Sequence, residues 1–200
     1  MTDGGALDDV DWAGYYAYLG ERPVRPLLTR ALEEYGEVAA GAAALDLGCG
    51  SGIETRALLA AGFSVTAVDA SAASMDLVGR LPETGTTLTP VRAAMQDADL
   101  PAADLVYAGY ALPFCPPDRF EELWRGIRGA LRPGGLLVCD LFGVRDAWSD
   151  EDYLTFVDRA SVDRLLEGLD VRFLAEIEEE GEAYAGPKHW HRFEVVARAG

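Results

Sequence analysis

The sequence predicts an α/β fold, a doubly wound and mostly parallel β-sheet with helices on both faces. Apolar strand-like runs alternate with helical patterns through five units. A glycine-rich turn at 48–52 joins the first run to a helix, and the chain closes on two strand-like runs joined by a polar turn. Such alternation is typical of parallel strands connected by helical crossovers. The closing hairpin places one antiparallel strand in the sheet.

Local patterns support each element in turn. Between positions 12 and 19, apolar residues recur at spacings of three and four, which gives one apolar helical face. Pro23 and Pro26 interrupt this pattern, so a second helix is predicted over 27–35. The Arg-Pro-Gly-Gly turn at 132–135 ends the helix before the fifth strand. Predicted strands lie at 43–47, 63–68, 87–93, 104–110, 136–142, 171–178 and 190–198. Predicted helices between them lie at 53–61, 72–80, 117–131 and 161–168.

Composition restricts the class of protein. The 200 residues are half hydrophobic and carry a net charge of -17, which predicts one globular domain with an acidic surface. Such a surface repels nucleic acid and anionic lipid, so neither is an expected partner. The start of the sequence lacks the pattern of a signal peptide, and no apolar run reaches the roughly 18 residues of a membrane helix. Three widely spaced cysteines form no zinc or disulfide pattern, so we expect a cytoplasmic protein. We also expect a monomer or a homodimer.

The glycine-rich turn and two carboxylates indicate the ligand. The run LDLGCGSG at 45–52 has glycines at alternate positions, so a ligand can approach the backbone closely. Dinucleotide-binding folds use G-x-G-x-x-G, and here the third glycine comes one residue earlier. Asp46 would repel a pyrophosphate but can accept a hydrogen bond from an ammonium, and Asp69 can accept both hydroxyls of a ribose. This pattern favours S-adenosylmethionine over a dinucleotide.

Four segments resemble the motifs of class I S-adenosylmethionine-dependent methyltransferases of the small-molecule type. They are 45–52 for the first motif, 68–71 for the second, 104–107 for the fourth strand and 131–138 for the turn before the fifth strand. The resemblance covers about 39–198 and implies a seven-stranded sheet in the order 3-2-1-4-5-7-6, with strand 7 antiparallel. It also implies a single domain over 1–200, in which 1–40 forms a helical lid.

The resemblance implies a set of cofactor contacts. Gly48 and Gly50 should line the methionine moiety, Asp69 should hold the ribose, and Tyr110 should lie beside the sulfonium. Arg22 or Arg25 is a hypothetical partner of the cofactor carboxylate. The family often has an acidic residue after the third strand; Ala94 stands there, so the Met95 backbone or Gln96 would replace that contact. The expected cofactor residues are Tyr16, Arg25, Asp46, Gly48, Cys49, Gly50, Asp69, Ala70, Ala94, Met95 and Tyr110.

The residues expected to contact the methyl acceptor lie in the N-terminal helix and near the ends of the predicted strands. Tyr15, Phe142 and Trp148 are predicted to contact the substrate. His189 and His191 start the last strand, which puts them at the ligand-binding edge if that strand is antiparallel. Residues two apart share a strand face, so both imidazoles can point the same way and one can act as a base. Surface or structural histidines are the alternative. No metal site is expected, because no third ligand is spaced nearby.

The predicted activity is methyl transfer from S-adenosylmethionine to the oxygen or nitrogen of a small molecule. The enzyme would align the nucleophile with the methyl group and exclude water. Two alternatives stay open. One is a module that binds this cofactor, or an enzyme that uses it in another reaction. The other is a nicotinamide-dependent oxidoreductase.

Overall fold

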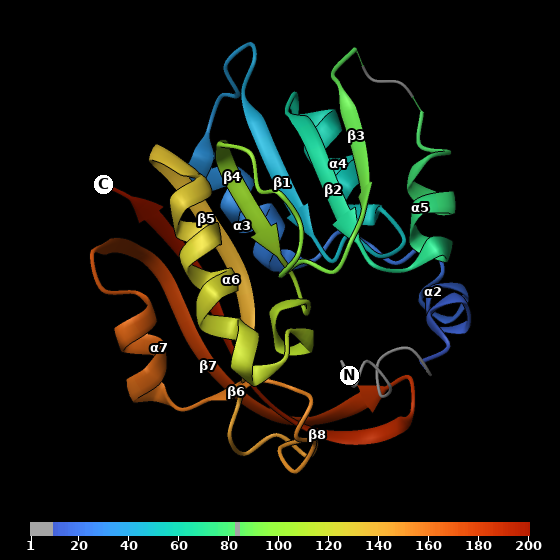
Figure 1. Cartoon of the computed structure of the whole chain (residues 1–200), viewed down its shortest axis with the longest axis vertical. Helices are drawn as coiled ribbons and strands as arrows, with labels where there is room; N and C mark the ends of the chain where they lie inside the picture. Colours follow the sequence, from blue (N-terminus) through green and yellow to red (C-terminus); the bar gives the residue numbers. More distant parts are fainter. Residues whose placement is uncertain (1–9, 83–84) are drawn as a thin grey trace.

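The computed structural model describes residues 10–82 and 85–200, and its sheet runs in the order β3-β2-β1-β4-β5-β8-β7 (Figure 1). Strands β3, β2, β1, β4 and β5 pair in parallel, and β8 pairs antiparallel with both β5 and β7. The predicted order and the antiparallel last strand are therefore confirmed. Residues 1–9 of the predicted lid lie outside the described residues.

The main departures from the predicted strands are at β5 and β6, and β7 and β8 are longer than predicted. The strands are β1 Ala43–Leu47, β2 Ser64–Asp69, β3 Leu88–Arg92, β4 Ala103–Ala108, β5 Leu131–Gly143, β6 Phe156–Val157, β7 Leu169–Ala183 and β8 Gly186–Ala199. Strand β6 pairs with the end of β5 and makes the sheet eight-stranded instead of seven-stranded. Its two residues are too few to show any periodicity. Strand β5 begins at Leu131, because the predicted turn at 132–135 is a register shift within the β4–β5 pairing.

Capping residues and prolines set the helix boundaries. The helices are α2 Trp12–Leu19, α3 Pro26–Tyr35, α4 Ile53–Ala61, α5 Ala72–Val78, α6 Pro117–Ala130 and α7 Arg159–Leu165, with a 3₁₀ turn at Leu112–Phe114. The side chains of Asp11 and Asp158 accept hydrogen bonds from the first turns of α2 and α7. Proline stands at the first position of α3 and α6, where its missing N–H costs no helical hydrogen bond.

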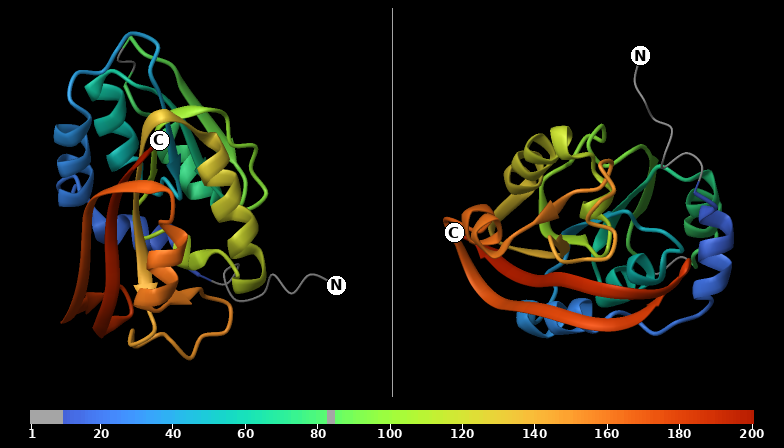
Figure 2. Two further views of the ribbon diagram at one scale, coloured as in Figure 1. Left: turned by 90° about the vertical axis from the view of Figure 1, so that its left-hand side faces the viewer. Right: turned by 90° about the horizontal axis from the view of Figure 1, so that it is seen from below.

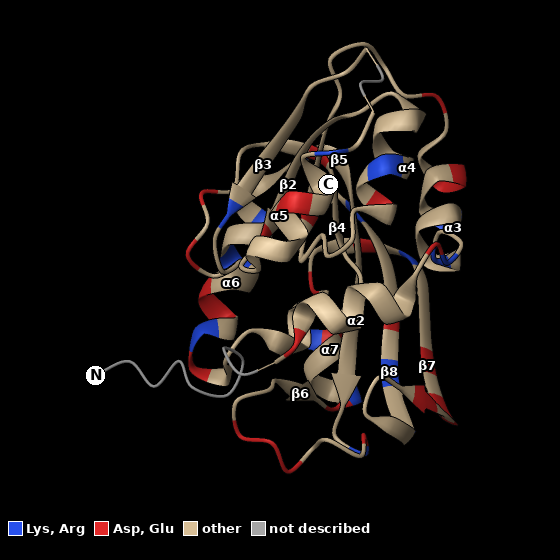
Figure 3. Ribbon diagram, turned by 90° about the vertical axis from the view of Figure 1, so that its right-hand side faces the viewer, with Lys and Arg blue, Asp and Glu red and all other residues tan. Residues whose placement is uncertain are grey.

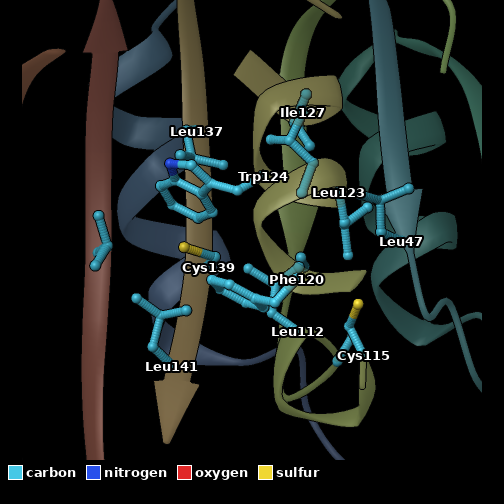
Figure 4. Close-up of a cluster of buried hydrophobic side chains, with 14 of the residues drawn as sticks. Leu47, Leu112, Cys115, Phe120, Leu123, Trp124, Ile127, Leu137, Cys139 and Leu141 are labelled. Carbon is cyan, nitrogen blue, oxygen red and sulfur yellow. The ribbon is translucent and has the colours of Figure 1, made fainter. Parts of the chain in front are cut away.

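The hydrophobic core has two halves, one on each face of the sheet. Alternate strand residues point to opposite faces, so Leu45 and Leu47 join one half and Ala44 the other. Helices α6 and α7 cover the first half, where Phe120, Trp124 and their neighbours pack on β5 (Figure 4). Helices α3, α4 and α5 cover the second half. Figure 2 shows the resulting three layers.

The β7–β8 hairpin is longer than predicted and curves beneath the carboxyl edge of the sheet (Figures 1 and 2). Its tip reaches α2, where the Tyr184 ring lies 5.9 Å from the Tyr15 ring and 5.4 Å from the Tyr18 ring. Acidic residues gather on β7 (Figure 3). Across 10–82 and 85–200, no helix has both the length and the apolarity that crossing a membrane requires.

Candidate functional site

A cavity of about 920 Å³ lies between the carboxyl ends of the central strands, α2 and the hairpin. Open α/β sheets bind ligands at this edge. Every residue expected to contact cofactor or substrate, apart from the two histidines, lines the cavity. These residues are Tyr15, Tyr16, Arg25, Asp46, Gly48, Cys49, Gly50, Asp69, Ala70, Ala94, Met95, Tyr110, Phe142 and Trp148. The fold therefore brings residues from positions 15 to 148 together around one space.

The glycine loop after β1 has a conformation that requires glycine. Gly48 and Gly50 have φ angles of 68° and 53°, in the left-handed region that side chains disfavour. A Cβ on Gly48 would lie 2.5 Å from the Cβ of Ala111, and one on Gly50 would lie 3.3 Å from Cε1 of Tyr16. The Gly48 N–H donates to the Val68 carbonyl at 2.8 Å, which ties the loop to β2. Bare backbone thus faces the cavity.

Asp69, at the end of β2, connects the glycine loop to α5. Its two carboxylate oxygens accept the backbone N–H groups of Gly50 at 2.9 Å and Ser71 at 2.8 Å. Burial raises the pKa of Asp69, and these two hydrogen bonds oppose the effect. Hydrogen bonds from the side chains of Ser74 and Tyr16 also lower the pKa of this carboxylate, which lines the cavity.

Asp46 is the second carboxylate of the cavity and is almost completely buried. Its Oδ2 accepts the Thr55 hydroxyl at 2.6 Å, which orients the side chain. Burial raises the pKa of Asp46 to about 7, because the charged form loses its hydration. Asp46 can therefore exist in either protonation state near neutral pH, and a cation in the cavity would favour the charged form.

Helix α2 covers the glycine loop from the solvent side. Trp12, Tyr15, Tyr16, Tyr18 and Leu19 all line the cavity. Tyr16 is buried against Gly50. Burial and the charge of Asp69 raise the pKa of the Tyr16 phenol, so it remains a neutral hydrogen-bonding group.

The two arginines considered for an anionic ligand have different surroundings. Arg22 makes two hydrogen bonds of 2.7 Å to the carboxylate of Glu54, in the first turn of α4. Arg25 lies with its guanidinium carbon 4.0 Å from the centre of the Tyr110 ring. Among the described residues no carboxylate forms an ion pair with Arg25, so Arg25 is the cavity cation better placed to accept one.

Tyr110 follows β4 in a strained conformation, with a φ angle of 55°. Its backbone N–H donates to Oδ2 of the buried Asp140 at 3.2 Å. Burial raises the pKa of Tyr110 to about 12, with the charge of Asp140 as the next cause. The strain and the buried carboxylate together hold this ring in the middle of the cavity.

Sequence reasoning missed part of the aromatic wall. Phe142 and Trp148 line the cavity together with Trp190, whose ring centre lies 5.7 Å from that of Phe142 and 5.8 Å from that of Trp148. Arg192 lines it as well and pairs with Glu179 at 2.7 Å. The available signal was the alternation in β8, because Trp190 and Arg192 are two residues apart and share a face.

The prediction that a histidine faces the substrate is corrected. Neither His189 nor His191 lines the cavity. Both occupy one face of β8, as expected for residues two apart, but it is the face opposite Trp190. His189 pairs with Glu180 at 2.7 Å and Glu178 at 3.1 Å. His191 is fully buried; its Nδ1 accepts the Arg145 N–H and its Nε2 lies 3.1 Å from Glu176.

Metal ligands do not gather in the part of the chain that the structure describes: it contains no group of three His, Cys, Asp or Glu side chains that could hold an ion. The three cysteines are buried and unpaired. Burial raises the pKa of each thiol, so none is an activated nucleophile.

Residues 44–135 match a protein-family model described as a methyltransferase domain. No curated protein sequence matches the chain. Among solved structures, TehB from Haemophilus influenzae is similar, with 14% identity and a TM-score of 0.75 over 94% of this chain and 67% of that chain.

Two further similar structures contain S-adenosylhomocysteine. One is the 1,6-didemethyltoxoflavin-N1-methyltransferase from Burkholderia thailandensis, which also holds 1,6-didemethyltoxoflavin; it is 21% identical, with a TM-score of 0.65 over 93% of this chain and 82% of that chain. The other is the N-methyltransferase NodS from Bradyrhizobium japonicum, 17% identical, with a TM-score of 0.62 over 98% of this chain and 93% of that chain. At these identities the likeness establishes the fold.

Proposed function

We propose that this chain, an S-adenosylmethionine-dependent methyltransferase with its family domain at residues 44–135, methylates an oxygen or nitrogen atom of a small molecule. The observation that carries the proposal is one cavity in which a glycine loop and carboxylates adjoin an aromatic wall. Its volume of about 920 Å³ suits two small molecules held together.

Features of the cavity fit the cofactor. Bare backbone at Gly48 and Gly50 leaves room for the methionine moiety, with Asp46 beside its ammonium. Asp69 lines the cavity as a hydrogen-bond acceptor for the ribose hydroxyls. The buried hydroxyl of Tyr107 lines the cavity and lacks a hydrogen-bond partner among the described residues, so a ligand would satisfy it.

The remaining cofactor contacts follow from the same arrangement. Ala70, Ala94 and Met95 would pack on the adenine, and Arg25 would pair with the carboxylate. Tyr110 would lie beside the sulfur, and Tyr16 and Cys49 would complete the enclosure. All of these residues line the cavity.

When bound, S-adenosylmethionine supplies a methyl group on a positively charged sulfur, which departs as the neutral thioether of S-adenosylhomocysteine. The residues of the chain have to hold the acceptor atom in line with this group and keep water out. Trp148, Trp190 and Phe142 provide an apolar wall for that purpose. Because no histidine lines the cavity, a neutral amine or an already ionised hydroxyl is the acceptor that the site suits.

Calorimetry followed by turnover tests the proposal. We expect S-adenosylmethionine and S-adenosylhomocysteine to bind, NADH not to bind, and S-adenosylhomocysteine to form when small phenols or amines are added. Binding of NADH without S-adenosylmethionine would contradict the proposal and favour an oxidoreductase. Cofactor binding without turnover across a broad panel of acceptors would instead favour a binding module.

A further inference from the structure

The only lysine of the sequence is buried behind the aromatic wall. Nζ of Lys188 lies 2.7 Å from Oδ1 and 2.9 Å from Oδ2 of Asp146. Asp146 also accepts the backbone N–H groups of Trp148 at 3.0 Å and His191 at 3.2 Å. Both charged side chains are less than a twentieth exposed. A buried pair satisfied in this way connects the loop after β5 to strand β8.

The same ammonium occupies an aromatic cage. Nζ of Lys188 is 3.5 Å from the ring centre of Trp190, 3.6 Å from that of Trp148 and 4.6 Å from that of Phe142. Aromatic cages of this kind commonly bind the quaternary ammonium of a ligand. Here the protein fills the cage with its own cation, while all three aromatic residues also line the cavity. The wall that faces the acceptor is therefore backed by the ammonium end of the buried Lys188–Asp146 ion pair.

We propose that the methyl acceptor is a neutral or electron-rich planar ring that stacks on the Trp148–Trp190 wall, and that Lys188 is the positioning residue that sets this wall. The inference rests on the proposed function, since it concerns the acceptor of that reaction.

Electrostatics favours a neutral ring over a cation at this wall. A cation on the cavity side of Trp190 would face, across the ring, an ammonium that lies 3.5 Å from the ring centre, and salt screens buried charges only weakly. The indole ring of Trp190 already makes a cation–π interaction with the Lys188 ammonium. A second cation on its other face would therefore gain little attraction. A neutral ring avoids the repulsion and keeps the stacking energy.

The shape of the chamber favours a flat molecule. The ring of Tyr110 stands edge-on to Trp190, with centres 5.7 Å apart, and Phe114 and Trp12 line the same space. Gly181 on β7, which pairs with Lys188, has no side chain, and a Cβ there would lie 3.2 Å from Cδ1 of Trp190. Lys188 therefore occupies one face of the Trp190 ring, and Gly181 leaves room for the ring on the neighbouring strand.

Three probes that share a bicyclic carbon skeleton test the acceptor class by calorimetry on protein saturated with S-adenosylhomocysteine. They are 2-naphthol, its saturated counterpart decahydro-2-naphthol, and 2-naphthyltrimethylammonium. We expect 2-naphthol to bind at least about tenfold more tightly than either of the others. Equal or tighter binding of the saturated or the cationic probe would overturn the inference. Failure to bind S-adenosylhomocysteine, measured first, would overturn the proposed function itself.

A double variant tests the part assigned to Lys188. Lys188→Met with Asp146→Asn removes both charges, so neither is left buried without its partner. The preference for 2-naphthol over the cationic probe should fall by about tenfold, while the affinity for S-adenosylhomocysteine stays within about twofold. A change in folding alone would not change the ratio of the affinities for the two ligands. An unaltered preference would overturn the assignment.

Two further variants complete the test. Arg159→Met with Asp163→Asn removes an exposed ion pair on α7, and the probe preference should stay unchanged. Lys188→Arg keeps the charge, so it should retain the wild-type preference and gives an answer even if the double variant does not fold. Loss of the preference in Lys188→Arg would contradict a dependence on charge.

Discussion

At the scale of single residues, the surroundings of two carboxylates separate their roles. Asp46 and Asp69 end neighbouring strands, and both line the cavity. Asp69 accepts two backbone N–H groups, which hold it at the loop, whereas Asp46 accepts one hydroxyl and has its pKa raised to about 7 by burial. We therefore propose that Asp69 is a fixed acceptor for the ribose, and we expect the charge of Asp46 to depend on whether a cation is bound beside it.

Replacing Asp69 should weaken cofactor binding more than it affects the fold. We expect Asp69→Ala to lower the affinity for S-adenosylmethionine by at least about tenfold to a hundredfold, because the loss of even one hydrogen bond to a charged group costs about 1.5–3 kcal/mol. Calorimetry measures the affinity, and circular dichroism checks the fold. Asp76→Ala, an exposed carboxylate on α5, is the control and should bind as the wild type does. An unchanged affinity in Asp69→Ala would remove this residue from the site.

At the scale of elements, the alternation of β8 divides its residues between two functions. Trp190 and Arg192 line the cavity, while His189 and His191 pair with acidic residues of β7 on the other face. A shift by one residue would exchange the two sets. The antiparallel pairing of Phe142 with Arg192 sets the register that prevents this exchange.

Neighbouring substitutions on β8 should therefore differ in effect. We expect His189→Ala to keep the rate of S-adenosylhomocysteine formation within about twofold, since its imidazole faces away from the cavity. Trp190→Ala, one residue further, should raise the KM for the acceptor while leaving cofactor affinity unchanged. Steady-state kinetics with an acceptor from the panel measures both. Loss of turnover in His189→Ala would restore the histidine as the base.

Helix α2 is the second element whose stability bears on the site. It has eight residues, and its N-cap Asp11 accepts the Gly14 N–H at 2.8 Å. Helices this short are marginal without such support. Since Tyr16 reaches the glycine loop from α2, fraying of the helix would open the cavity.

Removing this cap should lower cofactor affinity without lowering global stability. Asp11→Ala should destabilise α2 by about 1 kcal/mol, which weakens binding by up to about fivefold. Hydrogen exchange over 12–19 and calorimetry follow the two effects. Asp158→Ala removes the equivalent cap of α7, where Asp158 accepts the Ser161 N–H at 2.7 Å, and should leave affinity unchanged. An equal loss of cofactor affinity in both variants would show that the stability of α2 has no specific effect on cofactor binding.

At the scale of the whole molecule, burial of acidic groups couples folding to pH. Burial raises the pKa of both Asp46 and Asp140 to about 7. Asp140 faces Arg25, Arg192, Glu194 and the Tyr110 N–H, and its Oδ1 lacks a hydrogen-bond partner among the described residues. The folded state therefore binds more protons than the unfolded state between the ordinary carboxyl pKa and about 7.

The ligand-free protein should lose stability as the pH rises through this window. Each of the two groups lowers the free energy of unfolding by as much as about 1.4 kcal/mol per pH unit. Urea unfolding at pH 5.5, 6.5 and 7.5 measures the slope. Asp140→Asn, whose side chain is neutral at every pH, should reduce the slope of the unfolding free energy with pH. Asp76→Asn, a surface control, should leave the slope unchanged. Stability that rises with pH over this range would contradict the assignment.

The sequence by itself determined the alternation of strands and helices, the glycine loop and the two carboxylates beside it. These depend on local patterns, namely the period of apolar residues and the spacing of glycines and carboxylates at strand ends. The order of the strands and most of the cofactor contacts were implied by the resemblance to a known family of methyltransferases. The tertiary structure decided which face of β8 meets the cavity, because alternation states that His189 and His191 share a face but not which face. It also paired Lys188 with Asp146, 42 residues away, and added β6, since pairing between distant segments leaves no period in the sequence.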